Sequence, residues 1–201
     1  MSFHTPPIVS NAPVNWKVLE ETSLLSVPRS RYVLFLSLAT IGCLADLLSK
    51  WWVFARLGSP TGDRADIYWV WEGFFGFQTA CNPGALFGMG QGNGLLFAGL
   101  SVIAAVGIVY WLFVRKAAVD LWLTNALGLV TGGIFGNLYD RLGFGYQEGW
   151  PLIWKSAVRD WILFEYQGHP WPNFNIADSL LVCGAAMLVW HSFRYRDPAA
   201  N

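Results

Sequence analysis

Two aspartates in the C-terminal part of the chain have the residue type and the setting for acid–base chemistry. Asp160 lies in the stretch VRDW, and Asp178 closes the stretch FNIAD just before an apolar run. Two carboxylates held close together cannot both ionise without a large cost, so such a pair shares one proton and titrates as a unit. The ionised member can take a proton from water while the protonated member donates to a peptide carbonyl. If the two side chains meet, they can hydrolyse a peptide bond.

A second interpretation of the same residues needs no chemistry. Asn175 has the residue type of a helix N-cap, and Asp178 would then lie in the first helical turn, where the helix dipole favours a carboxylate. Asp160 would be an exposed loop charge beside Arg159, whose side chain we expect to face lipid headgroups. Composition and spacing alone leave both interpretations open.

The composition places these aspartates in a membrane protein. Of the 201 residues, 54% are hydrophobic and 13% are charged, and the formal net charge is zero. Apolar runs of about twenty residues are long enough to cross a hydrocarbon layer of roughly 30 Å. The balanced charge argues against a nucleic-acid partner, because no basic stripe is present to bind phosphates. We predict an all-α membrane protein with four transmembrane helices, at about residues 32–54, 94–114, 119–140 and 176–193.

Two long polar and aromatic segments connect the predicted spans. The first, residues 55–93, contains DIYWVWEGFFGFQTA, which predicts a short β-hairpin on the membrane surface, followed by a glycine-rich loop. The second, residues 142–175, carries several tryptophans, which are typical of membrane interfaces. The sequence therefore adds a small surface β-sheet and an interfacial segment, both on the outer face, to the four helices.

The basic residues near the span ends predict the orientation. They are concentrated in the N-terminal tail (1–30), in the short turn after the second span and at the C-terminal end, which continues into the tail 196–201. The positive-inside rule makes that side cytoplasmic. Both termini are then cytoplasmic, residues 31–195 form one membrane domain, and the outer face carries four polar residues of interest: Asn82, Asp140, Asp160 and Asp178.

Polar residues inside the spans call for partners. A charged residue near the centre of a membrane helix costs about 2.5–3.5 kcal/mol, so Asp46 and Lys50, four positions apart on one helix face, are expected to pair with each other or with a neighbouring helix. Three glycines recur every four residues on the third span and predict close helix packing: Gly128, Gly132 and Gly136. Packing does not explain the polar residues that end the same helix: Asn137, Asp140 and Arg141.

Five motifs occur in order along the four spans. They are Asp46 with Lys50, CNPGALFG at 81–88, GGIFGNLYDR at 132–141, VRDW at 158–161 and FNIAD at 174–178. Together they resemble lipoprotein signal peptidase, also called signal peptidase II, over about residues 32–195. Two residues depart from the family pattern, because Arg159 replaces a small or branched apolar residue and Trp161 replaces Phe or Tyr. The stretch from Asp140 to Asp160 is also longer than usual.

The resemblance implies that Asp160 and Asp178 are the catalytic aspartates of a membrane aspartyl endopeptidase. It implies a diacylglyceryl-modified prolipoprotein as substrate, cut before the lipid-bearing cysteine to release the signal peptide in the bacterial cytoplasmic (inner) membrane, near the outer leaflet surface. The outer segments would form a small sheet and an interfacial helix, with Trp161 to Trp171 facing the substrate. Globomycin-type inhibitors and membrane lipid are the other implied ligands, and no metal or organic cofactor is implied. Substrate-binding or site-supporting roles are implied for Asp46, Lys50, Asn82, Gly84, Asn137, Asp140, Arg141 and Asn175.

Two nucleophilic alternatives use other residues. Cys81 and His169 lie in segments predicted on the same face, but no third group that would orient them is identifiable. Ser49 and Lys50 are adjacent on one helix, where neighbouring side chains diverge by about 100°. The cysteine count does not indicate a disulfide framework, since it is odd and two members lie in predicted spans: Cys43, Cys81 and Cys183.

A non-enzymatic alternative is a small transporter. The intramembrane Asp46, Lys50, Asn137 and Asp140 would line an ion path, but most polar residues gather at one face and no internal repeat is visible. Zinc hydrolysis lacks an HExxH motif, and the three histidines are scattered through the chain.

Overall fold

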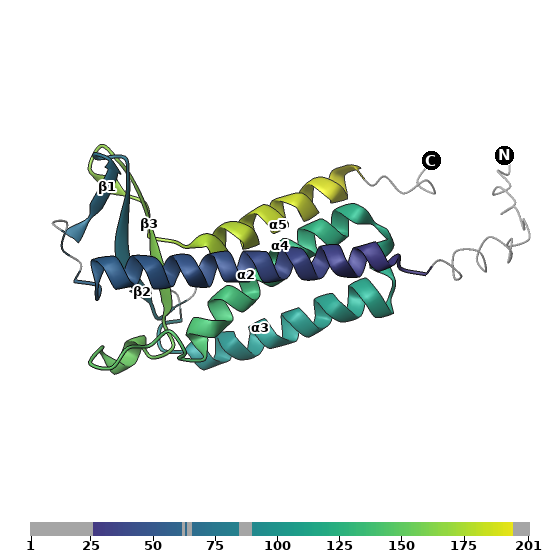
Figure 1. The fold of residues 1–201 in the computed structure, drawn as a ribbon, viewed down its shortest axis with the longest axis horizontal. Coiled ribbons are helices and arrows are strands. Elements are labelled where there is room, and N and C mark those ends of the chain that lie inside the picture. The colour runs from purple at the N-terminus through teal and green to yellow at the C-terminus, as the bar shows by residue number, and fades with distance from the viewer. Residues whose placement is uncertain (1–25, 62, 64–65, 85–89, 195–201) are drawn as a thin grey trace, which may run out of the picture.

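A computed structural model describes residues 26–61, 63, 66–84 and 90–194, in which four long helices carry a small sheet at one end (Figure 1). Most of the predicted tail 1–30 and all of the predicted tail 196–201 lie outside the described residues. Each predicted span coincides with a helix, and a π-helical turn, Tyr110–Val114, extends the second one. The helices are α2 (Arg29–Leu57), α3 (Gly94–Val109), α4 (Leu121–Arg141) and α5 (Ile176–Arg194).

Three of the described helices are long and apolar enough to cross a membrane: α2, α3 with its π-helical turn, and α5. Helix α4 has 21 residues but carries polar side chains that lower its mean hydropathy, and twelve of its residues are buried. It packs against α2, α3 and α5, so its polar groups face protein. The protein is therefore a mostly helical membrane protein with three candidate spans around a more polar central helix.

The glycines of α4 allow the neighbouring helices to approach closely, as predicted. A Cβ at Gly132 would lie 3.4 Å from the Cα of Gly42 on α2. On another face of α4, a Cβ at Gly133 would lie 2.5 Å from the carbonyl oxygen of Ala177 on α5. Larger side chains at these positions would separate α4 from the two helices that carry the polar residues of the site.

The sheet is antiparallel with the order β1-β2-β3-β4. Strand β1 (Tyr68–Trp71) and strand β2 (Phe75–Asn82) form the predicted hairpin, and their turn includes Gly73 at a φ of 67°. Strand β3 (Val158–Tyr166) pairs with β2 from a distant part of the chain, with Ala80 opposite Asp160, and the short β4 (His169–Pro170) follows it. Asp160 therefore lies in a strand, and the interpretation of it as an exposed loop charge is wrong.

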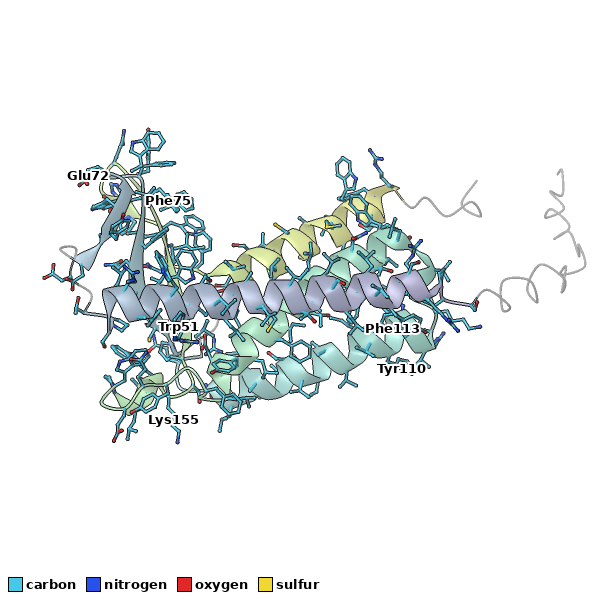
Figure 2. All side chains as sticks on the ribbon, viewed as in Figure 1. Trp51, Glu72, Phe75, Tyr110, Phe113 and Lys155 are labelled. Carbon is cyan, nitrogen blue, oxygen red and sulfur yellow. The ribbon has the colours of Figure 1, made fainter. Side chains whose placement is uncertain are left out.

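An aromatic cluster joins the sheet to the helices. Val53 and Phe54 at the end of α2 pack with Trp150 and Trp161 into a buried group. Figure 2 shows Phe75, Glu72 and Lys155 at this end of the molecule and Tyr110 with Phe113 at the other. Among residues 142–157, which precede β3, the helical element is a single 3-10 turn, Leu152–Trp154, in place of the implied interfacial helix.

Candidate active site

Asn175 lies between the two predicted catalytic aspartates and contacts both. Its Oδ1 accepts a hydrogen bond from the backbone amide of Asp178 at 2.8 Å, and its backbone amide donates to Oδ2 of Asp178 at 3.3 Å. This reciprocal capping holds the Asp178 carboxylate at the start of α5. The side-chain Nδ2 of Asn175 donates to Oδ1 of Asp160 at 2.6 Å. The predicted helix cap is thus confirmed, and the same side chain links it to Asp160.

Asp160 is almost fully enclosed by the protein, with 3% of its surface exposed. Burial raises the pKa of this carboxyl well above its ordinary value, and the negative charge of Asp178 raises it further. The positive charge of Lys50 and the hydrogen bond from Asn175 oppose that rise without cancelling it. Asp160 therefore holds a proton more readily than an ordinary aspartate does.

Asn137 on α4 is the second amide that contacts the pair. Its Nδ2 donates to Oδ1 of Asp178 at 2.8 Å. Its Oδ1 accepts from Lys50 Nζ at 3.0 Å and from Asn175 Nδ2 at 3.1 Å. The two asparagines and the two aspartates consequently form one hydrogen-bonded group contributed by α4, β3 and α5.

Four charged side chains form a buried network beside this group. Lys50 Nζ lies 2.7 Å from Oδ2 of Asp46 and 3.0 Å from Oδ2 of Asp140, and all three side chains are fully buried. Oδ1 of Asp46 accepts the backbone amide of Ala177 at 2.9 Å, which ties α2 to the first turn of α5. The predicted pairing of Asp46 with Lys50 is confirmed, and Asp140 completes it instead of turning toward Asp178.

Arg159 is the fourth member of this network, and the expectation that it faces lipid headgroups is wrong. Its Nε lies 2.8 Å from Oδ1 of Asp140, and its guanidinium lies over the rings of Phe54 and Tyr139 at 5.7 and 5.9 Å. Successive residues of a strand point to opposite faces, so Arg159 points toward the helices while Asp160 points toward Asn175. Sequence alone held no signal for this, since an arginine near a predicted membrane surface ordinarily stays hydrated.

Arg141 holds the loop that follows β2. Its guanidinium donates to the carbonyl oxygens of Asn82, at 3.3 Å, of Ser156, at 3.1 Å, and of Gly84. The side chain of Asn82 accepts the backbone amide of Gly84 at 3.0 Å, which tightens the same turn. The predicted supporting residues Asn82 and Arg141 therefore hold the backbone of this loop.

The two aspartates open on a cavity of about 1260 Å³. Its polar end is formed by Asp160, Asp178, Asn137 and Arg141, and its remaining walls are mostly apolar. Trp171 lines it, whereas Trp161 is buried on the other side of β3, so the segment from Trp161 to Trp171 lines the cavity only in part. The apolar walls include Phe97, Leu100, Ala104, Ile134, Phe174, Leu181 and Val182.

Over residues 38–194 the sequence matches the family described as Signal peptidase (SPase) II. The chain belongs to the signal peptidase II family. It is 56% identical to the lipoprotein signal peptidase of Rhodopirellula baltica over 167 residues, which cover 83% of this chain and 74% of that protein. It is 33% identical to that of Symbiobacterium thermophilum over 159 residues, covering 79% and 93%.

A solved structure described as a bacterial membrane enzyme has the same fold. It superposes with a TM-score of 0.65 at 26% sequence identity, covering 80% of this chain and 87% of that one. Signal peptidase II is an aspartic peptidase that removes signal peptides from prolipoproteins, and this chain has that activity by its family membership. The resemblance seen in the five sequence motifs is confirmed.

The geometry argues against the nucleophilic alternatives in this signal peptidase. Cys81 pairs with Arg159 and His169 with Tyr166, which are seven residues apart on β3, so the two are separated by roughly 20 Å. Burial, with the nearby negative charge of Asp140, raises the pKa of the Cys81 thiol to about 12. The Ser49 hydroxyl donates to the carbonyl oxygen of Asp46, and Lys50 is occupied by other partners.

Among the described residues, no group of three or more His, Cys, Asp or Glu side chains is placed to hold a metal ion. Two features of the site lay beyond sequence reasoning: the buried position of Arg159, and the contact between the side chains of Asn137 and Asn175. Both depend on pairing between segments that are far apart in the chain.

Proposed function

We propose that Asp160 and Asp178 are the catalytic pair of this signal peptidase and share one proton. The observation that carries the proposal is the position of Asn175, whose side chain donates to Asp160 while its backbone and side chain cap the helix turn that holds Asp178. Both carboxyls line the same cavity. Asn175 therefore holds both Asp160 and Asp178 at the polar end of the cavity.

The hydrogen bonds give the two acids different roles. Asp178 accepts hydrogen bonds from the side-chain amide of Asn137 and from the backbone amide of Asn175, and we assign it the role of the base. Asp160 is buried beside that charge, with its pKa raised, and keeps the proton. Asn175 contacts Oδ1 of Asp160, so the proton belongs on the other oxygen, Oδ2.

In the first step, Asp178 takes a proton from water as the water oxygen bonds to the scissile carbonyl carbon, and Asp160 gives its proton to the carbonyl oxygen. The tetrahedral intermediate then collapses. The amide nitrogen leaves with the proton held by Asp178, and the remaining hydroxyl returns a proton to Asp160. Each acid ends in its starting state.

The cavity suits a substrate that is part peptide and part lipid. Its apolar walls lie directly against the polar end, as a diacylglyceryl-modified cysteine next to a scissile peptide bond requires. We infer cleavage immediately before that cysteine. A globomycin-type cyclic peptide would occupy the same cavity and compete with the substrate.

We further infer that α4 crosses the membrane with the three more apolar helices, because it runs beside α2 and α5 and packs against both (Figure 1). Four crossings put both termini on one side, and the basic residues at the helix ends make that side cytoplasmic. The sheet and the polar end of the cavity then lie at the outer leaflet of the cytoplasmic (inner) membrane.

The test is cleavage of a diacylglyceryl-modified prolipoprotein by the purified full chain and by two variants, Asp160→Asn and Asp178→Asn. Both variants are expected to lose cleavage by at least about 10³-fold while keeping the fold, since each removes one proton-transfer group. Glu72→Gln, an exposed carboxylate in the β1–β2 turn, is the matched control and should cleave as the wild type. Turnover within about tenfold of wild type in either aspartate variant would remove that residue from the mechanism.

A further inference from the structure

Lys50 lies behind the catalytic pair without touching it. Its ammonium group is fully buried and contacts three acceptors: Asp46 at 2.7 Å, Asp140 at 3.0 Å and the Oδ1 of Asn137 at 3.0 Å. The contact with Asn137 is a hydrogen bond, and the contacts with the two carboxylates are ion pairs. The carboxylates of Asp46 and Asp140 would be enough to balance the lysine charge. The third acceptor is the side-chain oxygen of Asn137, whose nitrogen donates to Asp178.

Lys50 is one of three groups that fix the orientation of the Asn137 side-chain amide. Its oxygen accepts from Lys50 Nζ and from Asn175 Nδ2, and its nitrogen donates to Asp178. The reversed amide would place an NH₂ group against an ammonium and an oxygen against a carboxylate, and both contacts are repulsive. The amide therefore has one allowed orientation, in which Asp178 receives a donor.

We propose that Lys50 is a positioning residue for catalysis, which holds the Asn137 amide with its N–H toward Asp178, the base of the proposed mechanism. The proposal rests on the assignment of Asp160 and Asp178 as the catalytic pair. It assigns the lysine a role in the reaction besides its role in joining α2 to α4.

The charges around the pair determine the direction of the effect on catalysis. Asp46 and Asp140 balance Lys50 and Arg159, so the buried network is neutral as a whole. Without the lysine charge the network becomes negative beside the two aspartates, and the shared proton is held more tightly. The charged and titratable groups around the pair come from several elements: Asp46 and Lys50 on α2, Cys81 on β2, Asp140 and Arg141 on α4, and, on the opposite face of the strand, Arg159 on β3.

The decisive measurement is the pH profile of kcat for cleavage of a diacylglyceryl-modified prolipoprotein by Lys50→Gln. This substitution removes the charge but keeps an amide that can donate to a carboxylate. We expect kcat to fall about 30-fold with KM within threefold, and the acid limb of the profile to move up by about one pH unit. Lys155→Gln, the same change at an exposed lysine near the sheet, should leave both unchanged.

A second variant keeps the proposal testable if Lys50→Gln does not fold. Asn137→Leu removes the connecting amide but leaves the four network charges paired, and it should move the acid limb in the same direction. In the double variant, Lys50→Gln should cost less in kcat than it does in the wild-type background, because the contact through Asn137 is already lost and only the direct effect of the lysine charge remains. An additive loss would show that Lys50 acts independently of Asn137 and would overturn the proposal.

The aspartate variants separate this proposal from the one on which it rests. If Asp178→Asn and Asp160→Asn are inactive at every pH while Lys50→Gln or Asn137→Leu keeps the wild-type acid limb, only the role of Lys50 is wrong. If either aspartate variant cleaves at a near wild-type rate, the catalytic assignment itself fails.

Discussion

Arg159 and Asp140 form an ion pair on the face of β3 that points away from the cavity. The Nε of Arg159 lies 2.8 Å from Oδ1 of Asp140, and its backbone amide donates to the other carboxylate oxygen at 3.1 Å. Gly145 covers the pair, and a side chain there would collide with both partners. Because Asp160 is the next residue of the strand, this pair anchors the strand directly beside it.

Removing the guanidinium should destabilise the protein. Arg159→Met keeps the apolar stem but leaves Asp140 with Lys50 as its remaining charged partner, and we expect the free energy of unfolding to fall by about 3 kcal/mol. The measurement is thermal or denaturant unfolding of the purified protein in detergent. Arg56→Met, at an exposed arginine stacked on Trp52, is the control and should change stability by less than about 1 kcal/mol. Equal stability of the two variants would contradict the structural role of the buried pair.

The helices could be predicted from the sequence because their signal is local. Apolar runs of the length of the bilayer predicted all four, and the glycine spacing on α4 predicted which face would pack. The β1–β2 hairpin was equally local. Strand β3 could not be predicted in this way, because its pairing partner β2 is far away in the chain. Its polar and apolar residues also do not alternate regularly, so no periodic pattern indicates a strand.

Two contacts of the candidate site could be predicted from the sequence, and others could not. The cap formed by Asn175 follows from its position before an apolar run, and the i, i+4 spacing of Asp46 and Lys50 predicts their pairing. The ion pairs of Asp140 with Lys50 and Arg159 could not be predicted, since they depend on how α2, α4 and β3 pack together. The inward turn of Arg159 also depends on that assembly, because the carboxylate and the rings that hold it come from α2 and α4.

The raised pKa of Asp160 predicts a pH dependence of stability. The folded protein holds a proton on this buried group up to a higher pH than the unfolded chain, where the carboxyl titrates near 4. The folded state therefore binds more protons between the two pKa values, and this contribution to stability decreases as the pH rises from about 4 through the folded-state value. Asp160→Asn removes the titration, so it should raise the Tm at neutral pH and flatten its dependence on pH.

Thermal unfolding between pH 4 and pH 8 measures this effect. Glu72→Gln, an exposed carboxylate, should follow the wild-type curve. The prediction fails if Asp160→Asn lowers the Tm at neutral pH, because a neutral amide would then be worse accommodated than the buried acid.

The high pKa of Cys81 predicts that its thiol is dispensable. At a pKa of about 12 it is protonated at neutral pH and is a poor nucleophile. Cys81→Ala should therefore retain kcat within about threefold in the prolipoprotein assay, and His169→Ala, at the far end of the sheet, should do the same. A loss of about 10³-fold in Cys81→Ala would bring back the Cys–His alternative.

Close packing at Gly136 predicts that a single methyl group damages the site. A Cβ there would lie 2.6 Å from Oδ2 of Asp46 and 3.1 Å from the Cβ of Ala177, so Asp46 must move. That carboxylate oxygen binds Lys50, and its partner oxygen accepts the amide of Ala177. Gly136→Ala should therefore lower the free energy of unfolding by about 1–3 kcal/mol and also reduce kcat.

Gly107→Ala on α3 is the matched control, because a Cβ there meets no atom within 4 Å. It should be neutral or slightly stabilising, since alanine is the better helix former. A loss of stability in Gly136→Ala with kcat unchanged would mean that the packing of Asp46 supports only the fold. A parallel loss of stability and kcat, absent from Gly107→Ala, would show that the α2–α4–α5 junction also maintains the geometry of the two aspartates.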